Sequence, residues 1–196
     1  VANSIVLRAG ESVTDERVMQ EIGLPCFIKP SVGGSSFGVT KVKTQAQIQE
    51  AIAKAFSEGE EVMIEAYMQG TEVTSGMYKT KDVTRIFPIT EVVTDNEFFD
   101  YDAKYKDPNG AGLQIPADLS PDMIETIRSE AVKIYKALDA EGLSRVDFFI
   151  DKETNDLYFN EINTMPGFTS ISMFPKMCEK TGLNFTNLLE LLITQA

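Results

Sequence analysis

The sequence predicts an α+β protein, in which antiparallel strands joined by turns or loops are accompanied by amphipathic helices. Residues 143–163 contain two apolar runs around a polar turn, a pattern typical of a β-hairpin. Residues 48–56 carry apolar side chains at i, i+3, i+4, i+7 and i+8, which is the period of an amphipathic helix. The 196 residues contain no internal repeat or low-complexity linker, so one large domain or two small ones are expected.

Strands are expected where apolar runs are bounded by Gly, Pro or polar turn residues. The run at 26–30 enters a loop rich in Gly and Ser, and the chain returns at 37–42, so these two strands form a predicted hairpin. The predicted strands are residues 5–7, 26–30, 37–42, 61–67, 72–79, one or two within 85–93, 143–151 and 157–163.

Helices are expected where capping residues precede an apolar stripe. Thr44 and Gln47 fit a capping box, and Ser120 followed by Pro121 fits an N-cap with a first-turn proline. Residues 100–117 show neither period and predict a long loop. The predicted helices are a segment opened by a capping box at 12–15 and ending near residue 23, then 44–58, 120–141, 173–180 and 186–192.

Charge and composition exclude several classes of function. The net charge of −12 argues against nucleic acid or an anionic membrane as a partner. The absence of His excludes Ser-His-Asp and Cys-His nucleophile systems and His-ligated zinc. Cys26 and Cys178 form neither a disulfide framework nor a metal motif, so we expect buried thiols in a reducing compartment. No signal peptide or membrane-spanning run is present, and an initial Val in place of Met predicts a piece of a longer protein.

Two carboxylates and a carboxamide are expected to converge on one face of the hairpin. Taking residues 152–156 as its loop, alternation places Arg145, Asp147 and Phe149 on the same face as Phe159, Glu161 and Asn163. All-oxygen ligation of this kind suits Mg²⁺ held together with substrate phosphates. The alternative is an exposed hairpin with solvated charges. The predicted register pairs Asp151 with Leu157, Phe149 with Phe159, and Asp147 with Glu161.

The loop at 31–38 indicates a phosphate-binding flap. Its Gly and Ser residues allow backbone N–H groups to approach phosphate oxygens, and Lys29 on the entering strand can reach the same anion. The order is not that of a Walker A loop, because the lysine comes first and a strand follows. The alternative is a flexible glycine hairpin, but a lone lysine in an apolar strand favours an anion.

Two further segments suit a nucleotide. Residues 62–68 form an apolar strand whose backbone is suited to adenine, and Glu72 can accept ribose hydroxyls; surface glutamates are the alternative. Residues 101–106 hold two tyrosines and two lysines in the long loop, which suits a lid over phosphates; a solvated loop is the alternative.

Several spaced motifs together resemble the ATP-grasp superfamily and, within it, the D-alanine–D-alanine ligase family. The resemblance covers essentially the whole chain and implies the ATP-grasp fold, with two α+β subdomains whose mainly antiparallel sheets grip ATP between them. It places the subdomains at 1–74 and 75–196. The motifs are Lys29-Pro-Ser, Gly34-Ser-Ser-Phe-Gly38, Asp102-Ala-Lys-Tyr105, Ile115-Pro-Ala-Asp-Leu119, Arg145-Val-Asp147 and Asn160-Glu-Ile-Asn-Thr-Met-Pro-Gly167.

The same resemblance implies residue roles. ATP would be bound by Lys29, Ser35, Ser36, Glu65, Tyr67, Met68, Glu72 and Lys104. Two Mg²⁺ ions, or Mn²⁺ in their place, would be held by Asp147, Glu161 and Asn163. Roles in the reaction fall to Arg145, Gly167, Tyr105 and Ser36, and the second amino acid would contact Arg145, Gly167 and Ser172. Arg145 and the Gly167 N–H resemble the pair that stabilises an oxyanion, and Tyr105 resembles the lid tyrosine associated with dipeptide formation.

The activity implied by the resemblance is ATP-dependent ligation of two D-alanines through an acyl phosphate, for peptidoglycan precursors in the cytoplasm. Two alternatives stay open: another carboxylate ligase of this fold, such as a D-Ala–D-lactate enzyme, and a nucleotide-binding module without catalysis. Family members carry an N-terminal domain for the first D-alanine, and full-length members are typically homodimers. We expect that domain to lie outside these 196 residues, and we therefore expect the chain to bind Mg-ATP weakly and to be inactive alone.

Overall fold

A computed structural model describes residues 1–32, 38–80, 84–93, 112–169 and 171–194. The chain forms two compact units that divide after Gln69, and the second unit begins at Gly70. The boundary predicted from the sequence, after residue 74, falls within strand β5 (Gly70–Lys79) of the second unit. Among the described residues, no helix is both long enough and apolar enough to span a membrane.

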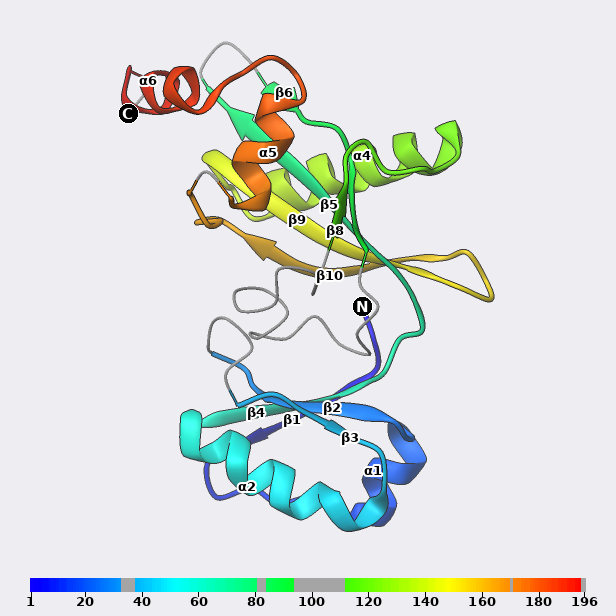
Figure 1. The fold of residues 1–196 in the computed structure, drawn as a ribbon. Coiled ribbons are helices and arrows are strands. Elements are labelled where there is room, and N and C mark those ends of the chain that lie inside the picture. Colours follow the sequence, from blue (N-terminus) through cyan, green and yellow to red (C-terminus); the bar gives the residue numbers. More distant parts are fainter. Residues whose placement is uncertain (33–37, 81–83, 94–111, 170, 195–196) are drawn as a thin grey trace. The chain divides into compact units, whose positions relative to one another are not determined.

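The first unit is an antiparallel four-stranded sheet in the order β1-β4-β2-β3 with helices packed on one face (Figure 1). Alternate strand residues, such as Ile28 and Ile64, are fully buried against Val18 and Ala55 of the helices. The opposite face therefore carries the remaining strand residues, Lys29 and Glu65 among them. The elements are β1 (Ser4–Arg8), α1 (Asp15–Glu21), β2 (Cys26–Pro30), β3 (Thr40–Val42), the 3-10 helix η1 (Gln45–Gln47), α2 (Ile48–Glu58) and β4 (Glu61–Ala66).

Two helix starts in this unit illustrate local sequence signals. The Gln47 side chain accepts a hydrogen bond from the Thr44 N–H at 3.1 Å, as the predicted capping box requires, although the first turn is a 3-10 helix. At α1, Thr14 is the N-cap and accepts from Arg17 N, so the helix begins two residues later than a cap at Ser12 would give.

The second unit is built on an antiparallel sheet with the strand order β10-β9-β5-β7-β8, and β6 also pairs with β5. The longest strand pairing is that of β5 with β9, which extends over ten residues of each strand. The elements are β5, β6 (Thr84–Ile86), β7 (Thr90–Val93), β8 (Gly112–Gln114), α4 (Pro121–Ala137), β9 (Gly142–Asp151), β10 (Leu157–Asn163), α5 (Met173–Glu179) and α6 (Phe185–Thr194).

Helices cover this sheet on both faces. Val73 and Val146 pack with Ile127 of α4 in one apolar cluster, whereas Tyr78 packs with Phe174 of α5 in another. Because residues 73 and 78 differ in parity, the two clusters lie on opposite faces, and Figure 1 shows α4 and α5 on either side of β5 and β9. The face under α5 extends along β5 to Thr74 and Glu72.

The β9–β10 hairpin carries a bulge that the sequence pattern did not predict. The predicted pair of Asp147 and Glu161 is confirmed, but Phe159 pairs with Phe148 and Leu157 with Ile150, because the register shifts between Phe159 and Glu161. The predicted pairs of Phe159 with Phe149 and of Leu157 with Asp151 were therefore wrong. The extra residue, Asn160, lets Phe159 face the apolar cluster while Glu161 faces the other way, so the predicted shared face of Phe159 and Glu161 was also wrong.

Candidate active site

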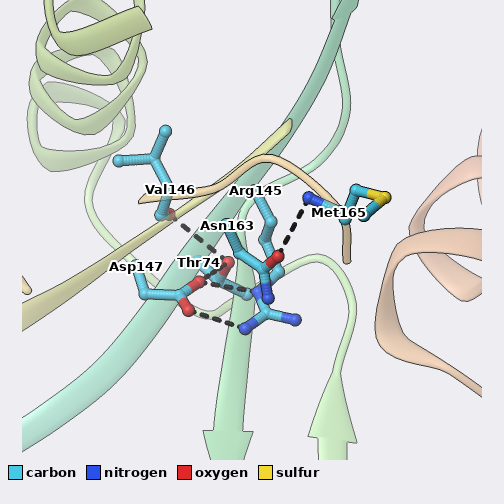
Figure 2. A network of polar contacts seen from close by, with 6 residues as sticks. All are labelled: Thr74, Arg145, Val146, Asp147, Asn163 and Met165. Carbon is cyan, nitrogen blue, oxygen red and sulfur yellow. Dashed lines mark hydrogen bonds and ion pairs between the residues drawn. The ribbon is translucent and has the colours of Figure 1, made fainter. Parts of the chain in front are cut away.

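The centre of the candidate site is an ion pair between two residues of β9. Arg145 donates from Nε to Asp147 Oδ1 at 2.8 Å and from Nη2 to Asp147 Oδ2 at 2.7 Å, as Figure 2 shows. The side chains are 17% and 5% exposed, so both charges are largely removed from water. A two-pronged ion pair with this burial fixes the orientation of both groups.

A second strand contributes to the same carboxylate. Thr74 of β5 lies directly opposite Asp147, and its hydroxyl donates to Asp147 Oδ1. Thr74 is 1% exposed. The Asp147 carboxylate thus accepts hydrogen bonds from its own strand and from the neighbouring strand β5, which accounts for its burial without loss of partners.

Two more acidic residues act on Arg145. Burial lowers the pKa of its guanidinium, but the hydrogen bonds and charge of Asp147, followed by the charges of Glu161 and Glu72, outweigh burial and raise the pKa overall. Arg145 therefore stays protonated. Glu72, the predicted ribose acceptor, thus belongs to the same charged group as Arg145 and Glu161.

The donor chemistry of this face fits a magnesium ion. Glu161 lies opposite Asp147, and Asn163 lies opposite Arg145, so two carboxylates and a carboxamide share one end of the hairpin. Asn163 Oδ1 accepts from Met165 N at 3.2 Å, which fixes the carboxamide (Figure 2). Among the described residues, no three Asp, Glu, Cys or His side chains gather closely enough to hold a metal. The carboxamide and phosphate oxygens of a substrate would therefore have to complete the coordination.

The segment after β10 brings together two residues that the sequence predicted for substrate binding. A Cβ added to Gly167 would lie 3.2 Å from Ser172 Oγ, so the Gly167 backbone and the Ser172 hydroxyl are neighbours. Ser172 Oγ accepts from Thr169 N at 3.1 Å and lies 2.8 Å from Thr169 Oγ1. The turn is thereby closed on itself and holds the hydroxyl in place.

The first unit holds the other predicted nucleotide ligands. Lys29 Nζ on β2 donates to Glu65 Oε1 on β4 at 2.8 Å, with the side chains 29% and 21% exposed. Tyr67 follows β4; its ring lies 5.9 Å from that of Phe27, and Lys41 Nζ lies 4.0 Å from its centre. Met68, next along the chain, is half-buried.

Four predicted residues, Ser35, Ser36, Lys104 and Tyr105, lie outside the described residues. Conversely, Thr74 and Lys41 lie beside predicted site residues but were not themselves predicted. Thr74 could have been found from period-2 spacing, because it lies two residues beyond Glu72 and so shares its face. Lys41 carried the same signal as Lys29, a lysine within a predicted strand, on the partner strand of the same hairpin.

This chain combines three features of ATP-grasp proteins. It has two antiparallel sheets covered by helices, a lysine on a strand before a glycine-rich loop in the first unit, and a set of Arg, Asp, Glu and Asn side chains on the sheet of the second. Solved structures agree with this class. The chain superposes on D-alanyl-alanine synthetase A from Vibrio cholerae with a TM-score of 0.84 and 31% identity, covering 98% of this chain and 59% of that one. The VanG D-Ala:D-Ser ligase from Enterococcus faecalis gives a TM-score of 0.79 and 35% identity over 100% of this chain and 56% of that one.

Sequence comparison narrows the class to a family. The family model of the D-ala D-ala ligase C-terminus matches residues 2–194. The D-alanine–D-alanine ligase of Bacteroides fragilis is 52% identical over 190 residues, which is 96% of this chain and 57% of that protein. The chain belongs to the D-alanine–D-alanine ligase family and corresponds to its C-terminal part. It spans little more than half the length of the relatives it matches.

Proposed function

We propose that this chain is the ATP- and magnesium-binding part of a ligase that joins two D-alanines into D-Ala-D-Ala for peptidoglycan precursors in the cytoplasm. The observation that carries the proposal is the set of Arg145, Asp147, Glu161 and Asn163 on one end of the β9–β10 hairpin, in a chain that matches the ligase family along its length. The two D-alanines, ATP, an N-terminal domain and a second copy of the full-length protein are the proposed partners.

The first step would transfer the γ-phosphoryl group of ATP to the carboxylate of the first D-alanine, giving an acyl phosphate and ADP. Bound Mg²⁺ or Mn²⁺ would neutralise the charge on the transferring phosphoryl group. Lys29 would contribute an ammonium group to the phosphates, and Glu65 holds it in place beforehand. Lys104, Ser35 and Ser36 are proposed to contact ATP as well. The adenine would be bound along Glu65, Tyr67 and Met68, and the ribose by Glu72.

In the second step the amine of the second D-alanine would attack the carbonyl of the acyl phosphate. The tetrahedral intermediate would then collapse by breaking the bond between carbon and the phosphate oxygen, so that phosphate leaves, the amine loses a proton and D-Ala-D-Ala remains. The tetrahedral intermediate carries an oxyanion that needs donors fixed in advance. A guanidinium has five N–H donors. Two of these N–H groups donate to Asp147, so three remain for the oxyanion and for the carboxylate of the incoming D-alanine. The Gly167 N–H and the Ser172 hydroxyl would donate beside it, and Tyr105 would close over the reactants.

The identity of the second substrate is a separate question. Similarity to a D-Ala:D-Ser ligase favours D-serine as the alternative acceptor to test, and D-lactate is the other, against which the resemblance of Tyr105 to a dipeptide-forming tyrosine argues. Product analysis with the full-length protein and equal concentrations of D-alanine, D-serine and D-lactate decides between them.

Calorimetry of the chain with Mg-ADP, paired with a phosphate-release assay in ATP and D-alanine, tests the proposal. We expect weak Mg-dependent binding of ADP and no D-alanine-dependent phosphate release. Failure to bind ADP at millimolar concentration would contradict the nucleotide site. Robust release of phosphate would contradict the requirement for an N-terminal domain.

A further inference from the structure

Thr74 is the one uncharged side chain that donates to the Asp147 carboxylate among the described residues. It sits on β5, 73 positions away in the sequence, yet directly across the strand pair from Asp147. Thr74 Oγ1 also lies 3.3 Å from the Val146 carbonyl oxygen. A hydroxyl has a single proton, and the carboxylate is both closer and charged, so the proton is directed to Asp147.

Counting lone pairs shows what this bond does. A carboxylate offers about four acceptor positions, two on each oxygen. Oδ1 accepts from Thr74 Oγ1 and from Arg145 Nε, so both of its positions are filled. Oδ2 accepts from Arg145 Nη2 alone, which leaves one position. The carboxylate is therefore held in a rotation that presents one lone pair of Oδ2.

We propose that Thr74 is a positioning residue of the metal site, whose hydroxyl saturates Oδ1 of Asp147 and so makes Oδ2 the single oxygen offered to a divalent cation. The inference rests on the proposed role of Asp147 as a metal ligand. It goes beyond that role in assigning the residue on β5 that sets the orientation of the ligand. Partners that orient metal ligands in this way change metal affinity about 10- to 100-fold when they are removed.

The test uses Mn²⁺ as the probe, in the presence of ADP, with free Mn²⁺ followed by electron paramagnetic resonance. Thr74→Val removes the hydroxyl and retains the branched shape, and Thr74→Ser retains the hydroxyl. The matched control is Thr90→Val, because Thr90 is 0% exposed and lies directly opposite Thr74 on β7, but bonds the Pro88 carbonyl instead. Asp147→Asn reports the effect of weakening the ligand itself.

We expect the Mn²⁺ dissociation constant to rise by about 10- to 100-fold in Thr74→Val. Thr74→Ser should restore it toward the wild-type value, and Thr90→Val should leave it unchanged. A merely structural role would move Thr74→Val and Thr90→Val alike. Should Thr74→Val fail to fold, Thr74→Ala removes the same hydroxyl without a second branch and is held to the same expectations.

The outcomes separate this inference from the proposed function. If Asp147→Asn loses Mn²⁺ while Thr74→Val binds it like the wild type, the role of Thr74 is overturned and the metal site stands. If Asp147→Asn also binds like the wild type, Asp147 is not a ligand, and the role of Thr74 and the proposed metal site are both overturned.

A further measurement needs no metal. The Arg145 Nε–H proton, followed by ¹⁵N spectroscopy, should exchange faster with water in Thr74→Val than in Thr90→Val.

Discussion

Asp147 and Glu161 lie directly opposite each other on β9 and β10, although they are separated by a turn and a bulge. The bulge at Asn160 restores Glu161 to the face that Asp147 occupies, after Phe159 has turned into the apolar cluster. Two carboxylates paired in this way repel each other unless a cation lies between them or beside them. Arg145 supplies one such cation, and the proposed metal supplies another.

Glu161→Gln is expected to weaken Mg-dependent ADP binding by the chain at least about tenfold, equivalent to about 1.4 kcal/mol. The reason is the loss of one of the two carboxylates proposed as metal ligands. Glu153→Gln, on the exposed turn of the same hairpin, is the matched control and should bind as the wild type does. Calorimetry with and without Mg²⁺ measures both. Unchanged binding by Glu161→Gln would favour the alternative of a nucleotide module without a catalytic metal.

Arg145→Lys is expected to impair ligation more than nucleotide binding. A lysine keeps the charge but loses the two-pronged contact with Asp147 and the fixed donors that remain. In the full-length protein, kcat for D-Ala-D-Ala should fall by about 10²- to 10³-fold, the usual effect of removing an oxyanion donor. The KM for ATP should change little. A fall confined to the KM for ATP would assign Arg145 to the nucleotide instead.

Lys29→Met is expected to raise the dissociation constant of Mg-ADP by about 10- to 100-fold, since a charge-assisted hydrogen bond contributes about 1.5–3 kcal/mol. The loss of its pair with Glu65 should cost little stability, because both side chains are partly exposed. Lys133→Met is the control: Lys133 also pairs with a glutamate, Glu130, but on the surface of α4. Equal ADP affinity in the two variants would contradict the phosphate role of Lys29.

The fold was largely predictable because its signals are local. The Thr44–Gln47 cap and the Ser120 N-cap follow from spacing within a few residues. The predicted Asp147–Glu161 pair is present because the bulge at Asn160 offsets a one-residue difference in register nearer the turn. The bulge at Asn160 was not predictable from alternation, since alternation assumes that every residue is paired. Thr74 escaped notice for a different reason: the pairing of β5 with β9 joins segments about 70 residues apart, and nothing local specifies its register.

For the site residues too, contacts within one hairpin were predictable from the sequence, whereas contacts between distant segments were not. Spacing on the hairpin was sufficient to put Arg145, Asp147, Glu161 and Asn163 on one face, and the β-ladder agrees. The ion pair of Lys29 with Glu65 was not predicted, because it crosses diagonally between two strands that are 36 residues apart. Which ligands these residues bind rests on the family and on the variants described above.

The two cysteines report separately on the two units. Cys26 lies in the first unit and Cys178 in the second; both are fully buried, and burial raises their pKa to about 11 and about 12, respectively. We therefore expect neither thiol to react with an aromatic disulfide reagent at pH 8 in the native chain, and both to react in denaturant. Rapid reaction of one cysteine alone would reveal that its unit does not fold in this chain.

The raised pKa values of the two thiols also predict that the folded chain loses stability at high pH. Because the folded pKa of each thiol lies above its ordinary value of 9.0, the unfolded chain releases its protons first. The contribution to stability is complete below pH 9 and is lost as the pH rises toward the folded values. Cys26→Ala and Cys178→Ala should each flatten the fall of the unfolding free energy between pH 9 and 11, measured with urea.

We propose that this chain supplies the ATP-dependent chemistry of a D-alanine–D-alanine ligase. The most direct measurement is the amount of D-Ala-D-Ala formed from ATP, Mg²⁺ and D-alanine by the full-length protein that contains this chain, with Asp147→Asn as its paired variant. We expect one D-Ala-D-Ala for each phosphate released by the wild type, and a loss of product of about 10²-fold or more in the variant. ATP hydrolysis without dipeptide, or undiminished product from Asp147→Asn, would contradict it.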